Sequence, residues 1–233
     1  MIAAMIMAGG IGSRMGAEEP KQFLDLGNKP IIIHTLEAFQ HSEHVHAIAV
    51  VCMPAWKEAM MRLTAQHCLT KLRWFFSGGD TRFDSTYNGI QGLKTHIEDD
   101  DILLIHDAVR PFVSNKVIAE NIAAARRVGA CSTVIPARDT IVISNDGKYM
   151  HAVPERKNLY HCQTPQTFRY GVIKSAFDRA AGIRGEAYTD DCSVVLAAGG
   201  KVALVTGDDR TFKITSPSDL DLASLFLVNG RKP

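Results

Sequence analysis

The first 23 residues place backbone N–H donors and two cations directly after an apolar run. Ile2–Met7 predicts a buried strand, and the glycines that follow it let the backbone turn sharply and expose its amides: Gly9, Gly10 and Gly12. Arg14 and Lys21 bring a planar guanidinium and a mobile ammonium to the same loop. Amide donors and cations at the end of a strand favour a polyphosphate, and an ordinary glycine turn with solvated cations is the alternative.

The spacing of this loop excludes two common nucleotide-binding fingerprints. A dinucleotide-binding GxGxxG motif needs a third glycine where Met15 stands. A P-loop needs a GK[ST] sequence, and none follows. The loop therefore belongs to another class of phosphate site.

A carboxylate follows a later apolar strand, predicted at 101–105. Asp107 is a hard oxygen ligand suited to Mg²⁺, with a turn aspartate that bonds its own backbone as the alternative. Pro111 restricts the backbone of Arg110, which we expect to brace this loop. We expect His106 to be structural rather than a general base.

The motif at 77–85 combines glycine, charge and hydroxyl groups. Gly79 and Asp80 can approach a base or ribose, and Ser85 can donate a hydrogen bond to it. The alternative is a helix N-terminus with Asp80 as the N-cap and Arg82 in solvent.

Two motifs near the C-terminus complete the set. Lys213 follows a short extended run and can reach a triphosphate, while Asp208 and Asp209 are second choices as metal ligands. Thr189 and Asp190 predict a helix N-terminus with Thr189 as its cap.

The elements that must position these residues alternate between strand and helix. Strands are predicted at 2–7, 47–52, 72–76, 101–105, 131–136 and 201–206, and helices at 30–39, 56–66, 81–93, 115–128, 170–181, 190–198 and from Ser216 onward. This alternation predicts one α/β domain over residues 1–233, with a mostly parallel sheet flanked by helices. Residues 137–160 interrupt this alternation of strands and helices. Extended runs at 140–144 and 148–153 predict a protruding β-hairpin arm there. Ligands of such sheets bind at the carboxyl ends of the strands, where the motifs lie.

Composition limits the classes of partner. The 233 residues carry 26 basic and 25 acidic side chains, a formal net charge of +1, so nothing favours nucleic acid or a membrane surface. No stretch approaches the roughly 18 apolar residues of a membrane span. The five cysteines are odd in number and lack a CxxC motif, which favours reduced thiols in a cytoplasmic protein over a zinc site or disulfides.

Taken together, the motifs resemble those of one family over essentially the whole chain. They are AGGIGSRMG with PKQF, SGGDTRFDS, HDAVRPF, RDT, QTPQTF with YTDD, and GDDRTFKIT, in that order. The pattern resembles the cytidylyltransferase family of 2-C-methyl-D-erythritol 4-phosphate cytidylyltransferase and ribitol-5-phosphate cytidylyltransferase. The resemblance implies a Rossmann-like nucleotidyltransferase fold, Mg²⁺ or another divalent cation, and transfer of CMP from CTP to a polyol phosphate with release of pyrophosphate.

The same resemblance implies a role for each matching position. The catalytic cations would be Arg14, Lys21 and Lys213, with Asp107 as the metal ligand. The nucleotide-binding positions would be Ala8, Gly9, Gly10, Gly12, Gly79, Asp80, Arg82, Ser85 and Ala108. The acceptor-binding positions would be Thr140, Arg156 and Thr189. The resemblance also implies a homodimer whose arms cross, so that each arm completes the partner's site.

The acceptor is predicted from finer resemblance. AGG, VRPF, DTIVISNDGKY and QTPQTF resemble the ribitol-phosphate branch, whereas TDDCSVV and GGKVALVTGD resemble the methylerythritol branch. We expect ribitol 5-phosphate, giving CDP-ribitol for teichoic acid synthesis, with 2-C-methyl-D-erythritol 4-phosphate, an isoprenoid precursor, as the alternative. Cys192 and Thr211 replace the alanine and asparagine usual in the family.

Two other classes of protein are weighed against this hypothesis. A nucleotide-binding module without turnover is disfavoured because Arg14, Lys21, Asp107 and Lys213 are all present. A nucleotide-sugar glycosyltransferase would carry a DxD metal motif after a strand, whereas the acidic run 99–101 precedes one.

Overall fold

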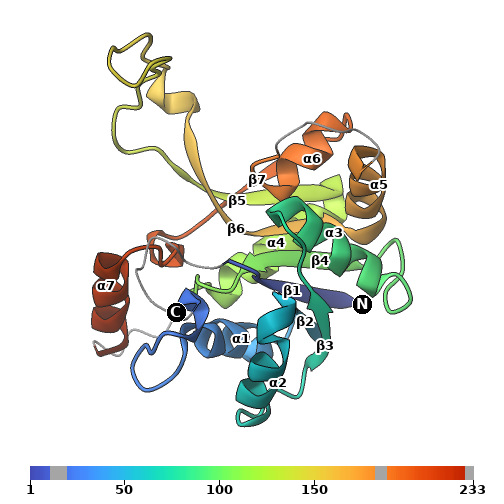
Figure 1. Cartoon of the computed structure of the whole chain (residues 1–233). Helices are drawn as coiled ribbons and strands as arrows, with labels where there is room; N and C mark the ends of the chain where they lie inside the picture. The colour runs from blue at the N-terminus through green and yellow to red at the C-terminus, as the bar shows by residue number, and fades with distance from the viewer. Residues whose placement is uncertain (11–19, 182–187, 229–233) are drawn as a thin grey trace.

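A computed structural model describes residues 1–10, 20–181 and 188–228 and has a seven-stranded sheet at its centre (Figure 1). The strand order is β3-β2-β1-β4-β6-β5-β7. The strands are β1 (Ile2–Ala8), β2 (Ala47–Cys52), β3 (Leu72–Ser77), β4 (Ile102–Asp107), β5 (Ala130–Pro136), β6 (Tyr160–Arg169) and β7 (Ala203–Thr206). Neighbours pair in parallel except that β6 runs antiparallel to β4 and β5. The predicted α/β class with a mostly parallel sheet is confirmed.

Helices cover both faces of this sheet. They are α1 (Ile31–His41), α2 (Lys57–Ala65), α3 (Arg82–Leu93), α4 (Asn115–Val128), α5 (Tyr170–Ala181) and α6 (Asp191–Ala197). A further helix, α7 (Pro217–Val228), packs in a third cluster with residues that include Leu26 and Phe112. Helices α1, α2 and α4 contribute to one buried cluster, and α3, α5 and α6 contribute to another. Strand β1 serves both, with Ile6 in the first cluster and Met5 in the second, because successive strand residues point to opposite faces. None of the described helices is long and apolar enough to cross a membrane.

Strand β6 is an element that the sequence pattern does not predict. Pro165 lies within it, and proline is rare inside a sheet because it lacks a ladder donor. The register between β5 and β6 shifts between Ser132 and Val134, beside this proline, and the Thr133 hydroxyl donates to the Pro165 carbonyl at 2.7 Å. The irregularity lets β6 continue across the proline and carry polar residues to the edge where the site lies.

Residues 137–160 leave the sheet between β5 and β6 and protrude from the body, as predicted (Figure 1). The two predicted extended runs pair only briefly: one antiparallel bridge joins Ile143 with Ala152, outside any named strand. Tyr149 is 77% exposed and Met150 is 65% exposed. A two-stranded ribbon is marginal in water without a third strand or a packed face, which explains the short pairing.

Candidate active site

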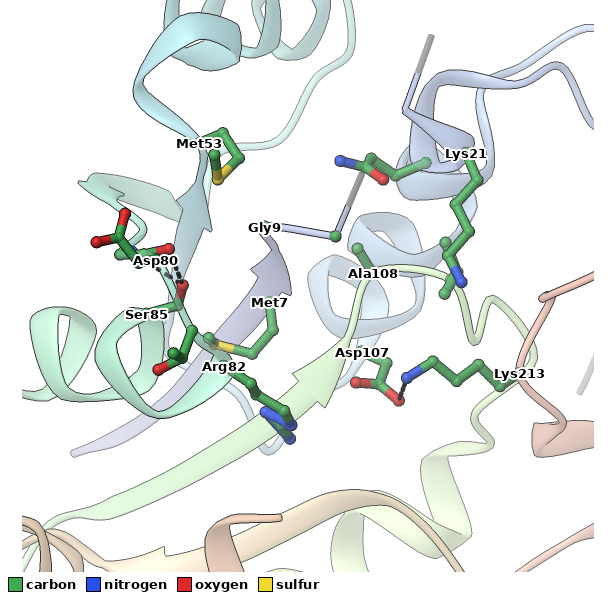
Figure 2. A pocket seen from close by; sticks show the side chains of 15 residues that line it. Met7, Gly9, Lys21, Met53, Asp80, Arg82, Ser85, Asp107, Ala108 and Lys213 are labelled. Atoms are coloured by element: carbon green, nitrogen blue, oxygen red, sulfur yellow. Dashed lines mark hydrogen bonds and ion pairs between the residues drawn. The ribbon is translucent and has the colours of Figure 1, made fainter. Parts of the chain in front are cut away.

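Loops that follow β1, β2, β3, β4 and β7 line one pocket of about 380 Å³ (Figure 2). Its walls comprise Met7, Gly9, Gly10, Lys21, Gln22, Met53, Gly79, Asp80, Thr81, Arg82, Ser85, Asp107, Ala108, Val109 and Lys213. The carboxyl ends of parallel strands meet at one edge of a sheet, so residues distant in sequence gather there.

A second pocket of about 290 Å³ shares a wall with the first. It is lined by Thr164 and Gln166 from β6 and by Thr189 from the segment before α6, among others. Three charged side chains belong to both pockets: Arg82, Asp107 and Lys213. Two compartments joined at a charged wall can hold two reacting substrates next to each other.

Asp107 lies in this shared wall and is held by two cations. Its Oδ2 accepts a hydrogen bond from Arg110 Nε at 3.0 Å and lies 3.1 Å from Lys213 Nζ (Figure 2). Burial opposes ionisation, but the charges of Lys213, Arg110 and Arg82 outweigh it and hold the pKa of Asp107 well below its usual range. The side chain is therefore a carboxylate at all physiological pH values.

Arg110 braces the loop after β4, as expected. It is only 9% exposed, and its Nη1 also donates to the Thr211 carbonyl at 2.8 Å. His106 is fully buried and bonds the Arg110 carbonyl through Nε2 and the Thr164 hydroxyl through Nδ1, both at 3.0 Å. A carbonyl can only accept, so Nε2 carries the proton and Nδ1 accepts from Thr164.

The Thr164 hydroxyl oxygen in turn accepts the Asp107 N–H at 3.1 Å. The His106 imidazole, on β4, thus binds the Arg110 end of the Asp107–Arg110 turn directly. It is linked to the Asp107 end through Thr164 of β6. Burial lowers the pKa of His106 to about 4, so the ring is neutral at pH 7 and its role is structural.

Lys213 reaches the shared wall because both of its neighbours are anchored. The Phe212 ring packs against Phe112 at a centroid distance of 6.1 Å. Ile214 is fully buried, and its N–H donates to the Val109 carbonyl at 3.0 Å. The ammonium is therefore presented from a fixed backbone.

Lys21 reaches the first pocket from a short 3-10 helix, Lys21–Phe23. The adjacent Gln22 is buried, and its amide donates to the Ala8 carbonyl at 2.8 Å, which fixes this helix to the end of β1. Ala8 itself is buried and does not line the pocket. Gly12 and Arg14 lie outside the described residues.

The loop after β3 is fixed by Ser85. Its Oγ accepts the Gly79 N–H at 3.0 Å. Helix α3 is capped by Thr81, which accepts from the Asp84 amide in a reciprocal capping box, so the alternative interpretation of Asp80 as the N-cap is wrong. Thr81 takes the capping position, and Asp80, one residue earlier, instead lines the pocket.

The helix start near residue 190 also differs from the prediction. Asp190, not Thr189, caps α6 by accepting from the Ser193 amide at 2.8 Å. Thr189 is thereby left to line the second pocket. Arg82, expected on the nucleotide or in solvent, forms an ion pair at 2.8 Å with Asp191, the first residue of this helix.

Several predicted residues are not brought to either pocket. Thr140 and Arg156 lie on the arm, where Arg156 Nη1 donates to the Arg138 carbonyl at 3.0 Å. Asp209 pairs with Arg138, and Asp208 caps a 3-10 turn, so neither second-choice metal ligand lies beside Asp107. Within the described ranges no group of three or more His, Cys, Asp or Glu side chains gathers to hold a metal.

Four residues of β6 line the second pocket and were given no role from the sequence: Cys162, Gln163, Thr164 and Gln166. They were missed because the strand itself was not predicted. The polar side chains on both sides of Pro165 in the QTPQTF motif are the sequence signal that points to them.

Cysteines take no part in the proposed chemistry. Cys192 is buried in α6, and burial raises the pKa of its thiol, so it is no nucleophile, as expected. All five cysteines are free thiols.

Known proteins match the chain over nearly its full length. A family model described as 2-C-methyl-D-erythritol 4-phosphate cytidylyltransferase (IspD) matches residues 2–229. A structure of 4-diphosphocytidyl-2C-methyl-D-erythritol synthase from Anaerococcus prevotii is 27% identical, with a TM-score of 0.84, and the match covers 98% of this chain and 96% of that one. For 2-C-methyl-D-erythritol 4-phosphate cytidylyltransferase from Thermus thermophilus the identity is 29%, the TM-score 0.77 and the coverage 96% and 98%. The chain therefore belongs to the IspD family and is a CTP-dependent cytidylyltransferase.

Proposed function

We propose that the chain transfers CMP from CTP to 2-C-methyl-D-erythritol 4-phosphate. A phosphate oxygen of the acceptor attacks the α-phosphorus of CTP in line; the new P–O bond forms as the bond to pyrophosphate breaks. A phosphate monoester is already nucleophilic at neutral pH, so neither a strong base nor a covalent enzyme intermediate is required. The protein contributes positioning and charge neutralisation.

The main support for this proposal is the wall that both pockets share, which Arg82, Asp107 and Lys213 form. The first pocket has the glycines and Lys21 that suit a nucleoside triphosphate, and the second has the hydroxyls of Thr164 and Thr189 that suit a polyol. With CTP in the first pocket and the acceptor in the second, the reacting phosphates meet at Asp107 and Lys213. Lys213, Lys21 and Arg14 would neutralise the charge that moves onto pyrophosphate.

The loop after β3 would select the base of the nucleotide. Gly79 and Asp80 line the first pocket beside Ser85, and Gly9, Gly10 and Ala108 face them. Close backbone approach suits a flat base and a ribose, which supports selection of cytosine at this point.

Mg²⁺ fits Asp107 in this arrangement. Both contacts to the carboxylate go to Oδ2, and no hydrogen bond to Oδ1 is seen among the described residues. Mg²⁺ in nucleotide sites is commonly held by one or two carboxylates together with substrate phosphates. Asp107 would hold the ion, which would supply positive charge against the triphosphate.

The arm would serve a second copy of the chain. Exposed apolar side chains, Val142, Ile143, Tyr149, Met150 and Val153, require a covering surface that the protomer does not supply. A symmetric dimer would cover them and bring Thr140 and Arg156 to the partner's acceptor pocket.

Ribitol 5-phosphate is the second candidate acceptor, favoured by the VRPF and QTPQTF motifs, whereas the family match favours the methylerythritol phosphate. Pyrophosphate release with CTP and each acceptor distinguishes them. We expect turnover with 2-C-methyl-D-erythritol 4-phosphate to exceed that with ribitol 5-phosphate by at least about tenfold in kcat/KM, on the scale of one mismatched polar contact. The reverse preference would overturn the proposed acceptor, and equal rates with UTP would overturn the role given to the loop after β3.

A further inference from the structure

Arg82 occupies a place that neither base recognition nor solvation explains. It is the first residue of α3, yet its side chain extends toward Asp107 rather than toward Asp80 (Figure 2). It lines both the nucleotide pocket and the acceptor pocket. Its charge is among those that lower the pKa of Asp107, which agrees with this position in the shared wall.

The guanidinium is fixed from one side only. Nη2 pairs with Asp191 Oδ2 at 2.8 Å, and Asp191 is 2% exposed. The other carboxylate oxygen of Asp191 accepts from the Thr86 hydroxyl at 3.0 Å, and its backbone N–H donates to Gln166 Oε1 at 3.0 Å. Contacts from α3 and β6 thus fix Asp191 at the start of α6, and the charged partner of its buried carboxylate is Arg82.

Arg82 also retains an unused donor. Nη1 is buried and has no hydrogen-bond partner among the described residues. A buried charged donor without an acceptor is costly, so such atoms commonly serve a ligand. Phosphate oxygens are the acceptors that suit a guanidinium best.

We propose that Arg82 is a catalytic residue that binds the acceptor phosphate at the junction of the two pockets, and that Asp191 is its positioning residue. This inference rests on the proposed phosphoryl attack across the shared wall. Arg82 would offset the repulsion between the incoming phosphate and the triphosphate as the P–O bond forms. A residue that recognised the base or the ribose would instead stabilise only the binding of CTP.

The test separates these roles by comparing kcat, acceptor KM and the Kd of CTP. We expect Arg82→Ala to lower kcat by about 10²-fold, the scale of one preorganised electrostatic contact. Acceptor KM should rise about tenfold, while the Kd of CTP from equilibrium dialysis should change less than about threefold. Arg82→Lys should recover only part of the loss, because an ammonium cannot bond Asp191 and a phosphate as a planar fork does. Asp191→Asn should lower kcat by about tenfold, since the guanidinium remains but loses its fixed orientation.

A matched control is Lys174→Ala. Lys174 pairs with Asp99 at the same 2.8 Å, and it lines neither pocket. This variant should leave all three constants within about twofold, the range of a surface ion pair. If Arg82→Ala fails to fold because Asp191 is left unpaired, the double variant Arg82→Ala/Asp191→Asn removes both charges and should show the same kinetic loss.

A folded Arg82→Ala protein with unchanged kcat and acceptor KM would overturn the inference, as would a loss confined to CTP binding. Failure of the wild-type protein to use either acceptor would instead overturn the proposed acceptors. In that event, calorimetric titration of inorganic phosphate into the CTP-loaded protein tests the same contact without turnover. We expect binding about tenfold weaker in Arg82→Ala, and equal binding in both proteins would refute the role of Arg82.

Discussion

The carboxyl edge of the sheet, where Asp107 and Lys213 lie and which we call the rim, and the arm at 137–160 position their functional residues in opposite ways. At the rim, Asp107 ends a strand that pairs on both sides, and Arg110 and Lys213 fix its carboxylate within one protomer. On the arm, the side chain of Arg156 donates to the Arg138 carbonyl and stands among exposed side chains. The rim is preorganised by the fold, whereas on our proposal the arm would depend on a surface of a second copy of the chain. Substitutions in the two regions should therefore differ in what they change.

The largest effect is expected at the rim. Lys213→Ala should lower kcat by about 10²–10³-fold, because one fixed cation at the reacting phosphates is lost. The unfolding free energy should fall only modestly, because the buried Asp107 carboxylate loses this cation but keeps Arg110. Steady-state kinetics and urea unfolding measure both quantities. Near-normal kcat would remove Lys213 from the proposed machinery.

The rim should also make stability depend on pH. The folded pKa of His106 is about 4 and its ordinary value is 6.5, so between these values the unfolded chain binds a proton that the native state excludes. Stability is therefore fully present above pH 6.5 and falls as the pH drops toward 4, by about 2–3 kcal/mol between pH 7 and pH 4.5.

Urea unfolding at the two pH values measures this loss, with His106→Asn as the control that cannot titrate. Asp107 does not obscure the result, because a carboxyl with a lowered pKa loses its stabilising effect only below its ordinary value of 3.8. An equal pH dependence in the variant would show that another group causes it.

On the arm, the expected effect is on one substrate. Arg156→Ala should raise the KM of the polyol phosphate by roughly 10–30-fold, the scale of a lost charge-assisted pair, and leave the KM of CTP nearly unchanged. Mixing this variant with Lys21→Ala chains should restore activity, because a hybrid site takes Lys21 from one chain and Arg156 from the other. Heterodimers without recovered activity, or a monomer by light scattering, would refute an arm that acts on a partner.

The same contrast explains what the sequence could predict. Apolar runs such as 47–52 are buried on both faces of a parallel sheet, and this strand and helix 115–128 have the predicted bounds. Asp107 was found because it follows such a run, and Lys213 because it follows the short extended run predicted before it. Strand β6 was missed because Pro165 disfavours a central strand and only its neighbours in space make the irregularity tolerable. The link between Arg82 and Asp191 joins helices more than 100 residues apart, and no local pattern encodes it.

The smallest effect should come from one glycine at the tip of the arm. Gly147 has φ +70° and open space around a hypothetical Cβ, so Gly147→Ala costs only backbone strain, about 1 kcal/mol. Gly89→Ala in α3 is the matched change in the body, where a Cβ would meet Met5 and Val51, and we expect a cost of about 2–3 kcal/mol from overpacking. Urea unfolding at a protein concentration that separates the protomers compares the two. A cost at Gly147 as large as that at Gly89 would mean that the tip packs within its own protomer, and the arm would then need no partner to be ordered.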